Sequence, residues 1–215
     1  MCGRFILLTD LSVITESFHI QEVSCEYRPD DNISPSQQVV AVLRRKDQNY
    51  LVNFRWGLIP SWAQDPSIGN RMFNARAETI AEKPSFREAF QKRRCLVVAD
   101  AFYEWQKSGK MRKPFRFSLK SGAPFGLAGL YETWTSAEGK HVHTCTIITT
   151  ESNDLLRPIH DRMPVIMSKE RETAWIDPDN RHQKGLLSLL KPYPAVEMDR
   201  ADMTDFMHSG VNHVG

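Results

Sequence analysis

The sequence of 215 residues lacks most features that would assign it to a specialised class of protein. It contains no apolar run long enough to cross a bilayer and no segment that resembles a secretory signal peptide. Its four cysteines show no Cys-x-x-Cys spacing. We therefore expect a protein of the reducing cytoplasm that has no cofactor and makes no contact with membranes.

The sequence also lacks a large excess of charge of either sign, since its formal net charge is +2 at pH 7. It has no polycationic arm of the kind that indicates binding to nucleic acid. Any anion-binding surface must therefore be local. Three short basic runs occur, each typical of solvated turns and strand ends: Arg44-Arg45-Lys46, Lys92-Arg93-Arg94 and Lys110-Met111-Arg112-Lys113.

Hydrophobic residues make up 41% of the chain, enough for a sizeable core, and no repeat or linker divides it. Segments rich in β-branched and aromatic residues predict strands at 38–43, 50–54, 94–99, 102–106, 114–119, 125–131 and 142–149. Apolar residues at helical spacing predict helices at 10–18, 85–93 with Ser85 as N-cap, 168–176 and 182–190. We predict one α+β domain over residues 1–215, with a mostly antiparallel sheet and peripheral helices, ending in a loosely held segment at 203–215.

The N-terminal pentapeptide MCGRF raises a chemical possibility. Removal of Met1 would leave Cys2 with a free α-amine and a thiol, whose ordinary pKa values near ~8 and ~8.5 make both nucleophiles partly available at neutral pH. The amine forms a Schiff base with an aldehyde, and the thiol then closes a five-membered thiazolidine ring in a fast intramolecular step. The alternative is that Cys2 is a small buried residue of an N-terminal strand.

A long segment with little periodicity, residues 55–75, predicts an ordered binding loop because it contains two tryptophans. The motif FNARAET (73–79) follows it and places Asn74, Arg76 and Glu78 at alternating positions. By itself this motif fits a helix N-terminus with Asn74 as the cap.

The stretch ADAFYEWQKSGK (99–110) predicts a strand and a hairpin. Alternation along the strand would turn Tyr103 and Trp105 one way, and Phe102 and Glu104 the other. Glu104 would then point into an apolar environment that raises its pKa, which suits a general acid or base. A surface glutamate at a hairpin is the alternative.

A turn that runs into an apolar strand is predicted at 157–167, RPIHDRMPVIM. His160 could shuttle a proton there, and Arg157 and Arg162 could hold phosphates. An ion-paired turn is the alternative. His141, His143 and Cys145 alternate along one predicted strand, but without an evident fourth ligand they are more typical of strand residues than of a metal site.

Together, the motifs MCGRF, WGLIPSW, FNARAET, DAFYEW and IHDRMPVI resemble the SRAP family, the SOS-response-associated or abasic-site-processing proteins, over roughly residues 1–168. The resemblance implies a mixed α/β fold around a β-barrel-like sheet. It also implies a sensor of abasic sites that crosslinks its N-terminal cysteine to the ring-opened sugar as a thiazolidine and shields the lesion. We expect a monomer whose partner is single-stranded DNA, cytoplasmic and at the nucleoid when bound.

The resemblance implies catalytic roles for four residues. Asn74 would orient Cys2 and the sugar, and Glu104 would act as acid and base in Schiff-base formation and ring opening. His160 would assist these proton transfers and the slow reversal of the crosslink.

Six further residues match positions that contact DNA in the family. The arginines would bind phosphates beside the lesion, and the tryptophan and proline would stack on or wedge between bases. The asparagine would support the site. These residues are Arg4, Asn32, Pro35, Trp62, Arg76 and Arg162.

Three alternatives remain open. Class II glutamine amidotransferases also begin Met-Cys-Gly and attack an amide with the thiolate, but their Asn-Gly and His-Arg-Gly segments do not occur here. The peptidase label of the family suggests that Cys2 and Glu104 release Met1 autocatalytically, a hydrolase activity beside the lyase-type crosslinking chemistry. A module that binds single-stranded DNA non-covalently, with Cys2 merely packed, is the third.

Overall fold

The computed structural model describes residues 2–109 and 111–204 and contains a strand or helix in each range predicted above, together with several short strands. The helices are α1 (Leu11–Ser17), α2 (Arg87–Lys92), α3 (Lys169–Ile176) and α4 (Gln183–Leu189), with 3₁₀ turns η1 (Pro66–Arg71), η2 (Ala77–Thr79) and η3 (Ala195–Glu197). The strands are β1 (Phe5–Leu7), β2 (Ile20–Val23), β3 (Asp30–Ile33), β4 (Gln38–Arg45), β5 (Gln48–Trp56), β6 (Asn74–Arg76), β7 (Arg94–Ala99), β8 (Ala101–Ser108), β9 (Met111–Leu119), β10 (Phe125–Thr135), β11 (His141–Glu151), β12 (Arg162–Pro164), β13 (Ile166–Met167) and β14 (Met198–Asp202).

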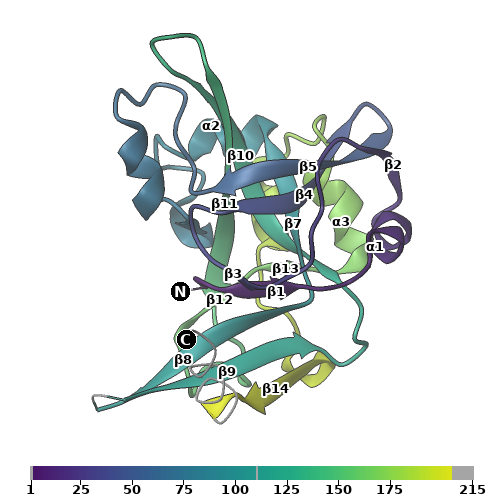
Figure 1. Ribbon diagram of the computed structural model, residues 1–215, viewed down its shortest axis with the longest axis vertical. Coiled ribbons are helices and arrows are strands. Elements are labelled where there is room, and N and C mark those ends of the chain that lie inside the picture. The colour runs from purple at the N-terminus through teal and green to yellow at the C-terminus, as the bar shows by residue number, and fades with distance from the viewer. Residues whose placement is uncertain (1, 110, 205–215) are drawn as a thin grey trace, which may run out of the picture.

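A closed ring of strands forms the centre of the molecule, in the order β11-β10-β7-β4-β5 and back to β11. Neighbours in the ring are antiparallel except for β5 and β11, whose parallel pairing closes it with Cys145 opposite Trp56. The helices lie around the strands (Figure 1). The predicted α+β class, with a mostly antiparallel, barrel-like sheet and peripheral helices, is confirmed.

A second sheet, ordered β14-β9-β8-β1-β3 and wholly antiparallel, packs against one end of the ring (Figure 1). Its strand β1 follows directly after Cys2-Gly3-Arg4 and pairs with β8, so that Phe5 lies opposite Phe102. This pairing places the N-terminal residues beside the strand that carries Glu104. The sheet therefore determines the surroundings of the first residues of the chain.

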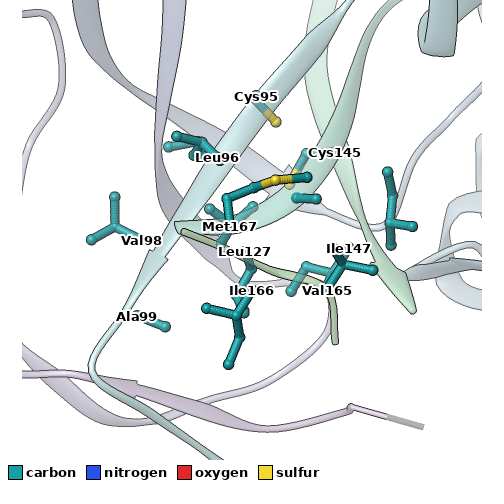
Figure 2. Packing of buried hydrophobic residues seen from close by; sticks show 14 of the residues in the cluster. Cys95, Leu96, Val98, Ala99, Leu127, Cys145, Ile147, Val165, Ile166 and Met167 are labelled. Atoms are coloured by element: carbon teal, nitrogen blue, oxygen red, sulfur yellow. The ribbon is translucent and has the colours of Figure 1, made fainter. Parts of the chain in front are cut away.

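The core fills the ring with side chains from β7, β10 and β11 (Figure 2). Cys95, Leu127, Cys145 and Ile147 are fully buried in it. Each large apolar side chain that is fully buried contributes about 1.5–3 kcal/mol to stability. The continuous apolar runs that predicted these strands are thus explained, because both faces of each strand are covered.

Two predictions about helix ends are wrong. Asn74 does not cap a helix, because residues 74–76 form β6 and pair in parallel with β11, Asn74 opposite Ile147. Pairing with the edge of β11 therefore outweighs the local sequence pattern that favours a helix cap at Asn74. Ser85 is not an N-cap either: α2 begins at Arg87 after a turn in which the Phe86 and Arg87 backbone N–H groups donate to the Lys83 carbonyl.

None of the described helices is long and apolar enough to cross a membrane. Of the segment 203–215, which was predicted to be loosely held, residues 205–215 lie outside the described part of the chain. The Met203 backbone N–H donates to the Pro114 carbonyl and thereby holds the end of β14 against β9.

Candidate functional site

The side chain of Cys2 is fully buried in the main core, just before β1. Burial raises the pKa of its thiol far above the ordinary range, and the negative charge of Glu104 raises it further, while a hydrogen bond from the Arg4 backbone opposes both effects. The thiol is therefore protonated at neutral pH. Burial of Cys2 fits the packing alternative, but its neighbours are not only apolar.

Glu104 is one of these neighbours and is only 3% exposed. Phe102, on the same face of β8, belongs to the main core, whereas Tyr103 packs with Trp105 in a separate cluster, so the predicted alternation is confirmed. Burial raises the pKa of the Glu104 carboxyl group, and its electrostatic interaction with His160 partly offsets this rise. The predicted direction of the pKa shift is therefore also confirmed.

Asn74 holds the backbone of Cys2 in place. Its Nδ2 donates a hydrogen bond of 2.7 Å to the carbonyl oxygen of Cys2. Its Oδ1 is buried and has no hydrogen-bond partner among the described residues. Because β6 is fixed by its pairing with β11, this contact ties the N-terminus to the wall of the barrel.

His160 ends the turn that precedes β12. Its Nδ1 accepts a hydrogen bond of 2.9 Å from the Arg162 backbone N–H and also lies 3.0 Å from Oδ1 of the exposed Asp161. Nδ1 cannot accept from the backbone and donate to a carboxylate at the same time. The backbone donor is fixed, so we assign the proton of the neutral ring to Nε2.

Cys2, Asn74, Glu104 and His160 are therefore brought together, and we call them the N-terminal cluster. Asn74 contacts Cys2 directly, Glu104 acts electrostatically on the Cys2 thiol, and His160 acts on Glu104. They come from the N-terminus, β6, β8 and the turn before β12. A buried acid beside an aminothiol precursor can donate and accept protons during addition to a carbonyl group.

Arg162 lies against an acid of the chain itself. Its two Nη atoms donate to the two carboxylate oxygens of Glu78 at 2.7 and 2.9 Å, and Nη2 also donates to the Thr149 carbonyl at 2.6 Å. The guanidinium lowers the pKa of Glu78. A phosphate that binds Arg162 would compete with Glu78, a residue to which sequence reasoning assigned no role.

The other two candidate phosphate ligands differ in their surroundings. Arg76 is exposed at the end of β6. The Arg4 guanidinium lies over the ring of Trp105, 5.5 Å from its centroid, and the Arg4 carbonyl accepts a hydrogen bond from the Tyr103 backbone. Arg4 thus lies beside the N-terminal cluster on the second sheet.

The remaining candidates lie on strand β3 and two loops. Asn32 is exposed in β3, Pro35 is half-buried in the following turn, and Trp62 is 61% exposed. Arg55 joins the two loops, because its Nη2 donates to Ser36 Oγ at 3.2 Å and to Asn70 Oδ1 at 2.7 Å. Sequence reasoning missed Arg55, since no local motif indicates a contact to both loops.

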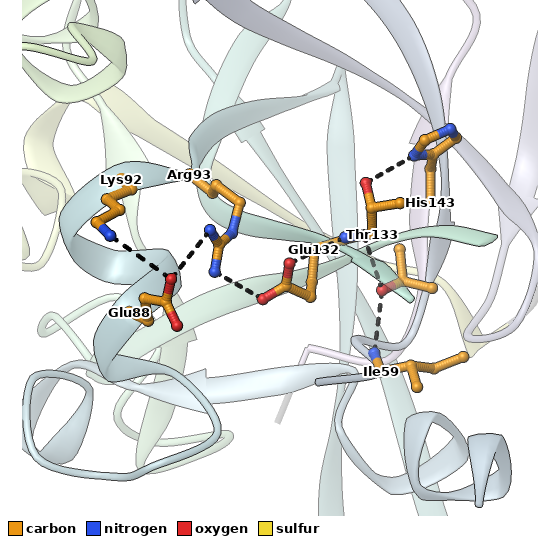
Figure 3. A network of polar contacts seen from close by, with 8 residues as sticks. Ile59, Glu88, Lys92, Arg93, Glu132, Thr133 and His143 are labelled. Carbon is orange, nitrogen blue, oxygen red and sulfur yellow. Dashed lines mark hydrogen bonds and ion pairs between the residues drawn. The ribbon is translucent and has the colours of Figure 1, made fainter. Parts of the chain in front are cut away.

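The loop that carries Trp62 is ordered, as predicted, and is held at several points. The Ile59 backbone N–H donates to Thr144 Oγ1 at 3.0 Å, beside the network in which Arg93 links Glu88 and Glu132 (Figure 3). The loop backbone passes so close to itself that a Cβ at Gly57, whose φ is +138°, would lie 2.5 Å from the Gly69 carbonyl oxygen. Only glycine fits at Gly57.

The histidines of β11 form ordinary strand contacts. His143 Nδ1 lies 2.9 Å from Thr133 Oγ1, and His141 Nδ1 lies 3.0 Å from Thr135 Oγ1. Among the described residues, no group of three or more His, Cys, Asp or Glu side chains could hold a metal ion.

The barrel and the N-terminal cluster define a protein that encloses the cysteine at position 2 of its sequence. The chain belongs to the SRAP family, whose model, described as SOS response associated peptidase, matches residues 1–209. The match extends beyond the motifs, which covered roughly residues 1–168.

Several relatives carry the name abasic site processing protein. YoqW of Bacillus subtilis is 45% identical over 216 residues, covering 99% of this chain and 96% of that protein. HMCES of Xenopus tropicalis is 30% identical over 79% of this chain and 60% of that longer protein. A crystal structure of a protein from Bacteroides thetaiotaomicron superposes with a TM-score of 0.87 at 28% identity, covering 96% of this chain and 94% of that one.

Proposed function

We propose that this chain processes abasic sites in single-stranded DNA by forming a thiazolidine crosslink through Cys2 once Met1 has been removed. It acts as a monomer of a single domain and shields the lesion. The observation that carries the proposal is the burial of Cys2 beside Glu104, with its carbonyl held by Asn74. The names of the relatives support abasic sites as the target.

The first step is attack of the Cys2 α-amine on the aldehyde of the ring-opened sugar. The product is a carbinolamine, whose hydroxyl group must leave as water. Glu104 supplies the proton for this departure, because its raised pKa keeps the carboxyl group protonated at a higher pH than usual. An iminium ion and the Glu104 carboxylate result.

The second step closes the ring. The Cys2 thiol is protonated because burial raises its pKa, so it needs a base before it can attack. The Glu104 carboxylate takes the thiol proton, the sulfur bonds to the iminium carbon, and the iminium electron pair returns to nitrogen. The sum is aldehyde plus aminothiol giving thiazolidine plus water, and Glu104 ends protonated as it began.

The other members of the N-terminal cluster position and assist. Asn74 fixes the Cys2 backbone and presents a buried Oδ1 without a described partner, which accepts a hydrogen bond from the sugar. His160 presents Nε2–H as a donor near Glu104 and assists the same proton transfers and their slow reversal. Phosphate contacts by Arg4, Arg76 and Arg162 make binding depend on salt.

The raised pKa of the Cys2 thiol argues against the reactions that need a free thiolate. Amide hydrolysis by an N-terminal nucleophile is one of these, and autocatalytic release of Met1 by thiolate attack is another. Self-release remains a separate proposal that mass spectrometry can test. If Met1 is retained in the Glu104→Ala variant but not in the wild type, self-release is supported. If Met1 is completely removed from both the wild type and the variant, self-release is excluded.

The test of the main proposal is a denaturing gel of the Met1-free protein incubated with an oligonucleotide bearing one abasic site. A slow, heat-resistant band is expected with the wild type, and none with Cys2→Ala or with an undamaged strand. Absence of the band, with Met1 removal confirmed by mass spectrometry, would overturn the proposal. Equal affinity for intact and abasic strands without a band would favour the non-covalent module.

A further inference from the structure

We infer that the outer face of the β8–β9 hairpin binds the DNA strand where it continues beyond the abasic site. We call this surface the hairpin stripe and define it as Trp105, Lys107, Arg112 and Arg116. The inference rests on the proposed function, because it gives the same partner a second point of contact. Figure 1 shows the hairpin reaching away from the barrel, beside β1 and β3.

The strand register places these side chains on one face. Trp105 pairs with Pro114, Lys107 with Arg112, and Tyr103 with Arg116. Residues directly opposite in an antiparallel pair project from the same side of the sheet, and so do residues two apart in one strand. Glu104 and its partner Phe115 therefore lie on the other face, toward the core.

The charge on this outer face is of one sign. Lys107, Arg112 and Arg116 are exposed. Glu104 is the only acidic residue in β8 and β9, and it lies on the opposite face. Lys113 also lies on the opposite face, where it forms an ion pair of 2.6 Å with Asp202. Arg112 and Lys113, which belong to a basic run interpreted from sequence as a solvated turn, thus lie on opposite faces.

Among the described residues, the acidic side chains near the stripe lie at its end remote from the hairpin tip. Asp31 of β3 acts on the Tyr103 hydroxyl group, and Asp199 of β14 lies two residues from Ala201, the partner of Arg116. The positive charge therefore increases toward the tip. A polyanion that leaves the N-terminal cluster gains contacts in that direction.

Aromatic and guanidinium planes lie where the stripe begins. The half-buried Trp105 ring lies under the Arg4 guanidinium and packs against the buried ring of Tyr103, 6.2 Å away. Unstacked bases bind to such planes, and a groove that alternates them with cations is typical of single-strand binding. Arg4 is two residues from Cys2 and lies over Trp105, so it links the N-terminal cluster on the core side of the sheet to the stripe on the outer face.

The combination of stacking planes and cations favours a nucleic acid strand over an acidic protein segment. A protein partner would gain from the charges but would not need flat planes between them. We therefore commit to single-stranded DNA as the occupant, and an acidic peptide becomes an outcome of the test.

The experiment measures binding of undamaged, fluorescently labelled DNA strands of about 5 and about 15 nucleotides, within the range of single-strand site sizes. The variant Arg112→Glu/Arg116→Glu is compared with Arg45→Glu/Lys46→Glu, which changes charge equally at the β4–β5 turn. For the long strand, the first variant is expected to bind at least about tenfold more weakly. Its slope of log K against log salt should fall by about 1.4, because each single-strand phosphate contact contributes about 0.7. The second variant should resemble the wild type.

Either of two results would overturn the inference. The stripe variant could keep the wild-type ratio of affinities for the long and the short strand, or the control variant could lose as much affinity as the stripe variant. Competition by a polyglutamate peptide as effective as by DNA would identify an acidic protein partner instead. Crosslinking of the short abasic strand separates the two proposals. The stripe variant should crosslink this short strand as the wild type does. Failure of the wild type to crosslink it would overturn the proposed function, but the dependence of DNA affinity on strand length could still be measured.

Discussion

The N-terminal cluster and the candidate DNA contacts around it differ in how firmly the fold holds them. Cys2 and Glu104 are buried and act on each other, and Asn74 is bonded to the Cys2 backbone. Arg76 and Trp62, by contrast, are exposed. The fold thus fixes the groups proposed to react, whereas DNA would order the side chains of Arg76 and Trp62. Substitutions in the first region should change the rate of reaction, and those in the second should change affinity.

The largest effect within this comparison is expected for Glu104→Gln. Loss of an acid and base should lower the crosslinking rate by about 10²–10⁴-fold with little change in affinity. The wild-type rate should be high while Glu104 is protonated and should fall as pH rises through its raised pKa. Single-turnover kinetics at several pH values would measure the crosslinking rate. If the rate of the variant falls with pH as that of the wild type does, Glu104 does not have this role.

The same substitution should change how stability depends on pH. A folded-state pKa above the unfolded value of about 4.3 means that the folded protein holds the proton more tightly. The contribution of Glu104 is therefore fully present below that value and is lost as pH rises through the raised pKa. The free energy of unfolding, measured with urea, should decline less over this pH interval in Glu104→Gln than in the wild type.

A smaller loss of rate is expected for Asn74→Ala. The Cys2 carbonyl would lose its donor in a partly buried position, at a cost of about 1 kcal/mol or more, and the Cys2 backbone would be less well aligned. We expect crosslinking to slow about tenfold and the melting temperature to fall. Asn53→Ala, which removes a donor to the Glu26 carbonyl on the surface, is the matched control and should leave the rate unchanged.

Among the exposed candidate DNA contacts, Trp62→Ala should weaken the binding of single-stranded DNA without changing the crosslinking rate. Stacking of a base on an aromatic ring contributes about 1–3 kcal/mol, so the dissociation constant for single-stranded DNA should rise about tenfold. The crosslinking rate at saturating DNA should match the wild type. A change in that rate without a change in affinity would place Trp62 with the N-terminal cluster instead.

The smallest effect is expected for Glu78→Gln, which is also the only one of these substitutions expected to increase the affinity for DNA. The ion pair of Glu78 with Arg162 would compete with phosphate, and a partly exposed pair of this kind contributes up to about 1 kcal/mol. Its removal should tighten DNA binding by up to about fivefold at low salt and by less at high salt. Fluorescence anisotropy across a salt series would detect the change, and weaker binding would show that Glu78 positions Arg162 rather than competing for it.

Sequence reasoning succeeded where the signal was local or matched a family motif. The apolar run 94–99 gave the bounds of β7 because that strand is covered on both faces. It failed where an element exists only through distant contacts, as β6 does through its pairing with β11. The Glu78–Arg162 pair and the contacts of Arg55 with two loops could not be predicted either, because no sequence pattern relates residues so far apart.

The parallel pairing of β5 with β11 has a consequence for how the protein is made. It joins Trp56 to Cys145, and a contact between residues so distant in sequence forms late and slowly during folding. Cys2 leaves the ribosome well before Asn74, Glu104 and β11, yet its enclosure needs all three. During synthesis Cys2 is therefore accessible to solvent until the barrel closes, and the rate of folding limits how long this exposure lasts.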